Sequence, residues 1–406
     1  MQSLDSSKAW VRAQECIGQG ALTNSKHPDS HVFGVYPTHV VGGSQAKLVG
    51  TDNKVYIDYI CGLGCNLFGY SPPGLIETLT RHMHKGFSHS LPTTDEIDTA
   101  NALKTMFYFV DKFKFLKSGS AACTAAIKMA RAYTGRKIVL SDGYHGHEDE
   151  FVSLTQPASG VHTCTEIKKY SDDIPLDDVA AVIIEPVITK YDDERVAWLH
   201  RLRERCTKAE TVLIFDEIIT GFRFEKNSVA LATNIVPDLI LLGKAIACGL
   251  PLAAVGGKKE ILDGDYFVSS TYAGETLSLA AARWTVDTLL NNQNFKIDKL
   301  VVLGQRFQNR FNEMAFPYVQ IEGYPTRGVF TGSALNKALF FQEAVKAGFL
   351  FGPSWFYSFA NAEYDFQFFE FLKDFISRMK LSSVSLQGAM PKSPFAQRVR
   401  DESRGR

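Results

Sequence analysis

Apolar residues in the middle of the chain gather in short unbroken runs instead of alternating with polar residues. Such runs predict strands of a parallel sheet that is buried on both faces. The runs cover residues 137–142, 179–185, 212–215, 237–243 and 252–256. Amphipathic segments that predict helices cover residues 73–85, 94–110 and 194–207, and an alanine-rich helix ends near Leu290. The alternation of strands and helices from about 50 to 290 predicts an α/β fold with helices on both faces of a mostly parallel sheet.

The two ends of the chain follow other patterns. Before the sheet, we predict a short helix over 6–16, an extended arm, and a hairpin over 47–58 that turns at Asp52–Asn53. After about 295, the pattern predicts a helix over 297–318, short strands over 318–335 and an aromatic-rich helix over 356–379. The predicted parts are an N-terminal arm (1–50), a large α/β domain (51–292), a small α+β domain (293–380) and a basic tail (381–406). We expect the tail to be loose or bound to the surface.

The composition is that of an ordinary globular protein, with 45% apolar and 22% charged residues and a formal net charge of zero. A neutral chain gives no reason to expect nucleic acid as a partner. No apolar run approaches the roughly 18 residues that a membrane span needs. Seven scattered cysteines indicate a reducing compartment, and the N-terminus carries no secretory signal, so we expect a cytoplasmic protein.

Two of the predicted strands end in residues that suit chemistry. Asp216 and Glu217 follow the run Val212–Phe215 directly, and Lys244 follows the next buried run 28 residues after Asp216. Ligands of open α/β sheets bind at the carboxyl ends of strands. A lysine that forms a Schiff base, with an aspartate for a pyridinium nitrogen, is the arrangement that holds pyridoxal 5'-phosphate (PLP). A surface pair of Lys244 and Asp216 is the alternative interpretation.

A phosphate site is predicted where the strand Phe113–Leu116 leads through Ser118-Gly119-Ser120 into an alanine-rich helix. The first turn of a helix has unpaired N–H groups and a partial positive charge, which together attract a phosphate. Gly119 would let the phosphate approach the backbone, and both serine hydroxyls can donate. The alternative is an ordinary serine cap at the start of the helix.

Further candidates follow two other strands. Tyr144 can stack on a flat cofactor ring, and His145 with His147 could bind a metal, although no third ligand at suitable spacing is evident. Glu185 ends the run that begins at Val179. A magnesium-dependent hydrolase using Asp216, Glu217 and Glu185 is a competing interpretation, but it leaves Lys244 and Tyr144 without a role.

Taken together, these motifs resemble the class III PLP-dependent aminotransferases, in the branch that includes glutamate-1-semialdehyde 2,1-aminomutase. The resemblance covers roughly residues 30–375. It rests on Ser118-Gly-Ser, Tyr144-His-Gly-His, Ile-Ile-Glu185-Pro, Phe-Asp216-Glu-Ile-Ile-Thr-Gly-Phe-Arg223, Gly243-Lys244 and Thr271-Tyr-Ala-Gly274. It implies the type I fold of PLP-dependent transferases and a homodimer with shared active sites.

The resemblance also implies roles for single residues. Lys244 would form the Schiff base, Asp216 would pair with the pyridinium nitrogen, and Thr271 would reach the phosphate in the neighbouring subunit. Ile218 and Tyr144 would cover the two ring faces. We expect Lys244, Asp216 and Tyr144 to be catalytic. The expected cofactor-binding residues are Ser118, Gly119, Ser120, Tyr144, His145, Glu185, Asp216, Ile218, Lys244 and Thr271. No metal is expected.

The chain departs from the family pattern at places that bear on the substrate. Ala121 stands where the phosphate loop usually has an acid, and Val187-Ile-Thr-Lys190 replaces a motif that carries asparagine in the aminomutase. The arm near His31–His39 has no clear match for the arginine that binds the substrate carboxylate. We therefore expect an aminotransferase with a small-molecule amino donor and a carbonyl acceptor other than glutamate semialdehyde. An aminomutase and a non-catalytic PLP-fold protein are the alternatives.

Overall fold

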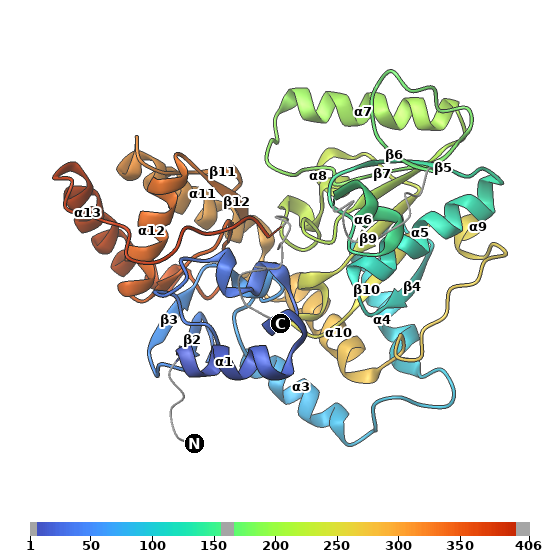
Figure 1. Cartoon of the computed structure of the whole chain (residues 1–406). Coiled ribbons are helices and arrows are strands. Elements are labelled where there is room, and N and C mark those ends of the chain that lie inside the picture. The colour runs from blue at the N-terminus through green and yellow to red at the C-terminus, as the bar shows by residue number, and fades with distance from the viewer. Residues whose placement is uncertain (1–5, 156–165, 395–406) are drawn as a thin grey trace.

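The computed structural model describes residues 6–155 and 166–394, and its centre is a seven-stranded sheet (Figure 1). The strand order is β4-β10-β9-β8-β7-β5-β6. All neighbours from β9 to β6 are parallel, and β10 runs antiparallel to both β9 and β4. The strands are β4 (Lys112–Leu116), β5 (Ile138–Asp142), β6 (Ile167–Lys169), β7 (Val179–Ile184), β8 (Val212–Asp216), β9 (Leu239–Leu242) and β10 (Ala253–Gly257). The predicted mostly parallel sheet is confirmed.

Both faces of this sheet are buried, which explains the unbroken apolar runs. Successive strand residues point to opposite faces, and in β8 Val212 and Ile214 pack into one core while Leu213 and Phe215 pack into the other. Helix α5 (Gly119–Thr134) covers the first face, and α7 (Asp193–Lys208) and α10 (Thr276–Asn291) belong to the second core. The remaining helices around the sheet are α3 (Pro73–Met83), α4 (Thr94–Met106), α6 (Asp149–Thr155), α8 (Val229–Thr233) and α9 (Lys259–Leu262).

A second lobe, on the left in Figure 1, combines both ends of the chain. One of its sheets has the order β1-β2-β3-β13 and the other has the order β11-β12-β14. The strands are β1 (Val40–Ser44), β2 (Lys47–Gly50), β3 (Val55–Asp58), β11 (Gln320–Tyr324), β12 (Arg327–Thr331), β13 (Phe349–Leu350) and β14 (Ser354–Phe356). The helices are α11 (Ile297–Ala315), α12 (Ala334–Lys346) and α13 (Asp365–Lys380), with α1 (Ser6–Cys16) and the short α2 (Cys61–Gly64) nearby in the chain.

Of the elements predicted at the two ends of the chain, some are confirmed and one is partly wrong. The helix over 6–16 and the hairpin over 47–58 are confirmed as α1 and as β2 paired with β3. The helix predicted over 356–379 is wrong in its first part, because Phe356 ends strand β14 and the helix begins only at Asp365. Phe356 is fully buried beside Tyr59, whose carbonyl accepts from the Phe356 N–H, so strand-like packing prevails over the helical pattern.

The first half of the predicted tail lies against the body of the protein. Ala389 forms a bridge with Phe33, and the Lys392 ammonium pairs with Asp29 at 3.3 Å. The buried Gln342 side chain holds the same segment, since it donates to the Ser385 carbonyl and accepts from the Gln387 N–H. This described part is therefore bound to the surface, and the rest of the predicted tail lies outside the described residues.

Candidate active site

A cavity of about 330 Å³ opens at the edge of the sheet where the parallel strands end. Because β9, β8, β7 and β5 are successive neighbours, the residues that follow them lie side by side. The cavity collects nearly all of the predicted site residues. Its lining includes Ser118, Gly119, Ser120, Tyr144, His145, Glu185, Asp216, Ile218 and Lys244.

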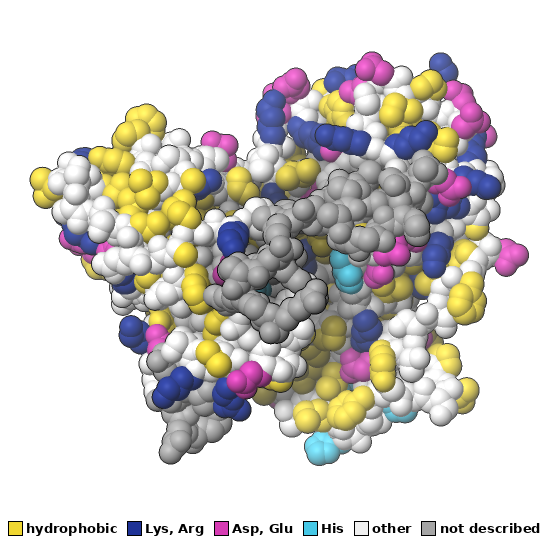
Figure 2. Space-filling model, in the orientation of Figure 1, with side chains coloured by type: hydrophobic (Ala, Val, Ile, Leu, Met, Phe, Trp, Pro, Cys, Tyr) yellow, Lys and Arg dark blue, Asp and Glu magenta, His cyan; other side chains and the backbone are white. Residues whose placement is uncertain are grey.

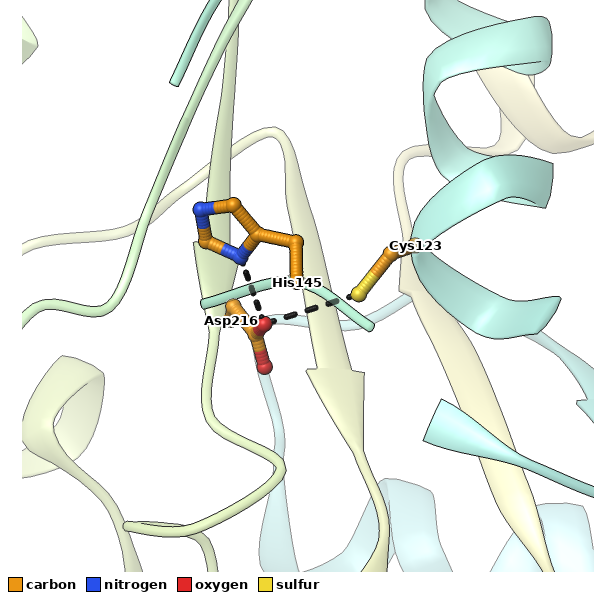
Figure 3. Close-up of side chains that lie close together, drawn as sticks. All are labelled: Cys123, His145 and Asp216. Carbon is orange, nitrogen blue, oxygen red and sulfur yellow. Dashed lines mark hydrogen bonds and ion pairs between the residues drawn. The ribbon is translucent and has the colours of Figure 1, made fainter. Parts of the chain in front are cut away.

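Asp216 ends β8 and is almost completely buried (Figure 3). Its Oδ2 atom accepts a hydrogen bond from Nδ1 of His145 at 2.7 Å and one from the Cys123 thiol at 3.5 Å. Its Oδ1 atom accepts from the Ile218 N–H at 3.1 Å. A buried carboxylate held by three donors is fixed in place, and its charge is available to one cationic partner in the cavity.

Lys244 begins a short 3₁₀ helix, η5 (Lys244–Ala247), directly after β9. Its backbone has a φ of 42°, in the left-handed region that non-glycine residues rarely adopt. Residues held in such conformations concentrate at functional sites. Just before it, Gly243 makes room for Ile218, whose Cγ2 would be 3.0 Å from a Cβ at that position. Ile218 thereby packs against the strand end that carries Lys244.

The start of α5 also lines the cavity. The Ser118 hydroxyl caps the helix by accepting from the Ala121 N–H at 3.1 Å. The Ser120 hydroxyl is 3.1 Å from Nδ1 of His147 and accepts from the His147 N–H. A Cβ on Gly119 would approach Cδ1 of Ile218 to 2.8 Å, so a larger residue at 119 would require Ile218 or the helix start to shift. Both the serine cap and a phosphate cradle predicted from the sequence are compatible with this geometry.

Glu185, after β7, connects the strand ends to the loop after β5. Its Oε1 atom accepts from the Tyr144 N–H at 2.8 Å, which fixes the start of the Tyr144 loop. Burial, and then the negative charge of Asp216, raise the pKa of Glu185. The positive charge of Arg327 in β12 lowers the pKa of Glu185 and so partly offsets these two effects. Burial in turn lowers the pKa of Arg327.

Glu217 does not belong to this cavity. It is fully buried, and its carboxylate accepts from the N–H groups of Val229 and Ala230 and from the Thr220 hydroxyl. It therefore holds the start of α8. The three acids of the magnesium interpretation therefore do not form one metal site among the described residues. The potential metal ligands that do lie close together there are Cys123, His145 and Asp216. His147 is bonded to Ser120 instead of completing a His-x-His pair.

Thr271 lies apart from the other predicted residues. It is exposed, in the loop before α10, and does not line the cavity of its own chain. Its predicted role in a neighbouring subunit stays a prediction.

Several cavity residues were not predicted from the sequence. They are Cys65, Lys117, Gly146, Ile219 and the segment Gly249–Leu252. Lys117 pairs with Glu275 at 3.1 Å, and burial lowers its pKa. Cys123 was also missed as a neighbour of Asp216. It stands four residues after Gly119, which is one helical turn along the same face, so the helix period could have indicated it.

A family model described as Aminotransferase class-III matches residues 34–171 and 164–355. These ranges include every residue that lines the cavity. The chain belongs to the class III aminotransferases.

Relatives of this class III chain include two proteins named glutamate-1-semialdehyde 2,1-aminomutase. The protein from Syntrophomonas wolfei is 34% identical over 71% of this chain and 74% of its own length. The one from Thermomicrobium roseum is 30% identical over 90% of this chain and 96% of its own length. The resemblance to the aminomutase branch is confirmed.

Solved structures show that the fold is that of PLP-dependent transaminases. The FumI protein of Sphingopyxis sp. MTA144 aligns with a TM-score of 0.85 and 21% identity, covering 94% of this chain and 98% of its own. A glutamate-1-semialdehyde aminomutase from Pseudomonas aeruginosa aligns with a TM-score of 0.79 and 19% identity, over 92% and 94% of the two chains. The predicted type I fold is confirmed.

The cavity of the class III chain fits a pyridine ring that carries a phosphate. A buried carboxylate and the start of α5 both line it, and the glycine at 119 leaves space that a Cβ would fill. The Nε2 atom of His145 is buried and has no hydrogen-bond partner among the described residues.

As for membranes, the described helices include none with the length and apolar character that a span requires.

Proposed function

We propose that this class III protein is a PLP-dependent aminotransferase that moves an amino group between an amine or amino acid donor and a carbonyl acceptor. The observation that carries the proposal is that Lys244 and the buried Asp216, at the carboxyl ends of neighbouring parallel strands, line the same cavity as the N-terminus of α5. An amine, a buried acid and a phosphate cradle together are the requirements of this cofactor.

Each residue has a defined task in this proposal. Bound PLP supplies an electron sink for the carbon that loses its proton. The Lys244 amine would bind the cofactor and, when free, could take a proton from the substrate carbon and return it; positioned proton transfer of this kind contributes about 10²–10⁴-fold to the rate. Asp216 would pair with the ring nitrogen and keep it protonated. Ile218 and Tyr144 would pack against the ring, and Ser118, Gly119 and Ser120 would hold its phosphate.

An aminomutase is the second candidate, because the two relatives described above carry that name. The proton transfer at Lys244 would be the same in both reactions. The departures at Ala121 and Val187–Lys190 favour a different substrate from glutamate semialdehyde. Consumption of an external amino donor distinguishes the candidates, since an aminomutase rearranges its substrate without net transfer of an amino group from a second molecule.

We further propose that the active enzyme is a homodimer with shared sites. Large hydrophobic side chains are exposed near the start of α4 and in the loop before α10; they are Phe87, Leu91, Ile97, Phe267 and Tyr272. The start of α10 lies against the first of these segments, since the Thr276 N–H donates to the Phe87 carbonyl at 3.0 Å. Figure 2 shows hydrophobic side chains in the lower part of its face, in the region of α3 and α4. Exposed apolar groups of this kind mark interaction surfaces, and a second copy here would bring Thr271 close to an interface.

The decisive experiment is the visible spectrum of the purified protein before and after borohydride, followed by peptide mapping. We expect a yellow protein that borohydride bleaches, with the pyridoxyl group on Lys244. Lys244→Ala should lose this adduct, whereas Lys117→Ala, which changes the other lysine of the cavity, should keep it. A colourless protein that takes up no added PLP would contradict the proposal, as would an adduct at another lysine.

A further inference from the structure

We propose that Cys123 is a positioning residue that fixes the Asp216 carboxylate so that Oδ1, and not Oδ2, is left for the ring nitrogen of the cofactor. The inference rests on the proposed function, because it concerns how the chain presents Asp216 to bound PLP. It assigns a task to a buried thiol that the proposed reaction does not otherwise use.

The first observation is the number of donors at each carboxylate oxygen, of which Figure 3 shows the two at Oδ2. Oδ2 accepts from two side chains, His145 and Cys123, at 2.7 and 3.5 Å. Oδ1 accepts only from the Ile218 N–H, at 3.1 Å, among the described residues. A carboxylate oxygen offers about two lone-pair sites. Oδ2 is therefore filled, and Oδ1 keeps one site for a further donor.

The second observation is the direction of the sulfur contact. An ionised carboxylate only accepts, so the thiol must donate. Cys123 is fully buried in α5, and burial together with the Asp216 charge raises the pKa of the thiol well above its usual value. The sulfur therefore keeps its proton, and the donor persists across the working pH range.

The third observation is that the two donors approach from different elements. Cys123 belongs to α5, whereas His145 belongs to the loop after β5 and packs edge-on against Phe151 with ring centroids 5.4 Å apart. The final torsion of an aspartate side chain is broad and nearly two-fold. His145 on Oδ2 and the Ile218 N–H on Oδ1 already limit this rotation, and Cys123 adds a third donor, from a further element, that restricts it more.

The test compares three variants loaded with PLP. Cys123→Ala removes the donor, Cys123→Ser keeps one, and Cys206→Ala changes a buried cysteine of α7 that does not contact Asp216. For Cys123→Ala we expect PLP to dissociate about five-fold more readily and the pH midpoint of the cofactor's absorbance to shift by about half a unit, as a weak hydrogen bond allows. Cys123→Ser should return both values to within about two-fold of the wild type, and Cys206→Ala should change neither.

Two results would overturn the inference, and both are separable from the proposed function. One is a Cys123→Ala protein that binds PLP with the affinity and absorbance midpoint of the wild type. The other needs no variant: a crystal structure of the wild-type holoenzyme in which the ring nitrogen bonds Oδ2 instead of Oδ1. A wild-type protein that binds no PLP overturns the proposed function first, and this inference with it. Melting temperatures of the PLP-free variants show whether a loss of PLP affinity results from a less stable fold.

Discussion

At the scale of single residues, the neighbours Asp216 and Glu217 take opposite tasks because they point to opposite sides of the strand end. Asp216 faces the cavity, and Glu217 accepts two backbone N–H bonds from the start of α8. Glu217 is thus a structural carboxylate buried beside a functional one. Burial raises its pKa from the ordinary value of 4.5 to about 7.

This shift makes a prediction about stability. The folded state holds a proton on Glu217 up to about pH 7, whereas the unfolded chain releases it near pH 4.5. Stability from this group is therefore present below pH 4.5 and is lost as the pH rises to 7, by about 3 kcal/mol at most. In Glu217→Gln, urea unfolding of the PLP-free protein should show a smaller drop in free energy between pH 5 and 7 than in the wild type. An identical drop in both proteins would contradict the prediction.

At the scale of elements, the start of α5 packs closely against Ile218, which follows β8. This close packing is possible because residue 119 has no side chain. Gly119→Ala would place its Cβ 2.8 Å from Cδ1 of Ile218. We expect PLP to bind about tenfold more weakly, equivalent to about 1.4 kcal/mol, because the helix start or Ile218 must shift. Equilibrium titration with PLP measures the effect.

A second change in the same pair serves as the control for Gly119→Ala. Ile218→Val removes the Cδ1 atom that the new methyl group would meet, so the double variant should bind PLP more tightly than Gly119→Ala alone. A double variant that binds no better would show that the steric reason is wrong. Melting temperatures should stay close to that of the wild type, since α5 keeps its Ser118 cap.

The same scale explains which elements could be predicted from the sequence. The strands of the large sheet were predictable because burial on both faces gives unbroken apolar runs. Helix α12 is not predicted, because its residues 338–345 are all buried, Gln342 and Glu343 included, so the helix lacks the separate polar and apolar faces that mark an amphipathic helix. The positions of Lys244, Asp216 and Ser118–Ser120 at strand and helix ends were predictable from local order. The contacts of Cys123 and His145 with Asp216 depend on packing between distant segments, which periodicity does not show.

At the scale of the whole molecule, the exposed hydrophobic groups near α4 and the loop before α10 bear on assembly. We expect light scattering after size exclusion to give twice the chain mass of 45.1 kDa. Leu91→Asp, at a side chain that is 78% exposed, should weaken the dimer and speed the loss of PLP, because a charge would be buried unpaired. Thr271→Ala should speed PLP loss and leave the dimer intact.

The control for assembly is Phe366→Asp, which changes a similarly exposed hydrophobic residue on α13, in the other lobe. It should alter neither mass nor PLP retention. A fully active monomer at working concentration would refute the shared-site proposal.

The pairing of β3 with β13 also constrains how the chain is made. Ile57 pairs with Phe349, about 290 residues later, so the ribosome must complete most of the chain before this sheet can close. At about 5–20 residues per second, that wait is roughly 15–60 s. During this time the edge of β3 that will meet β13 offers unpaired backbone groups, the kind of edge that recruits other chains. A product truncated before Phe349 would keep this edge permanently, and we expect it to aggregate where the full-length chain does not.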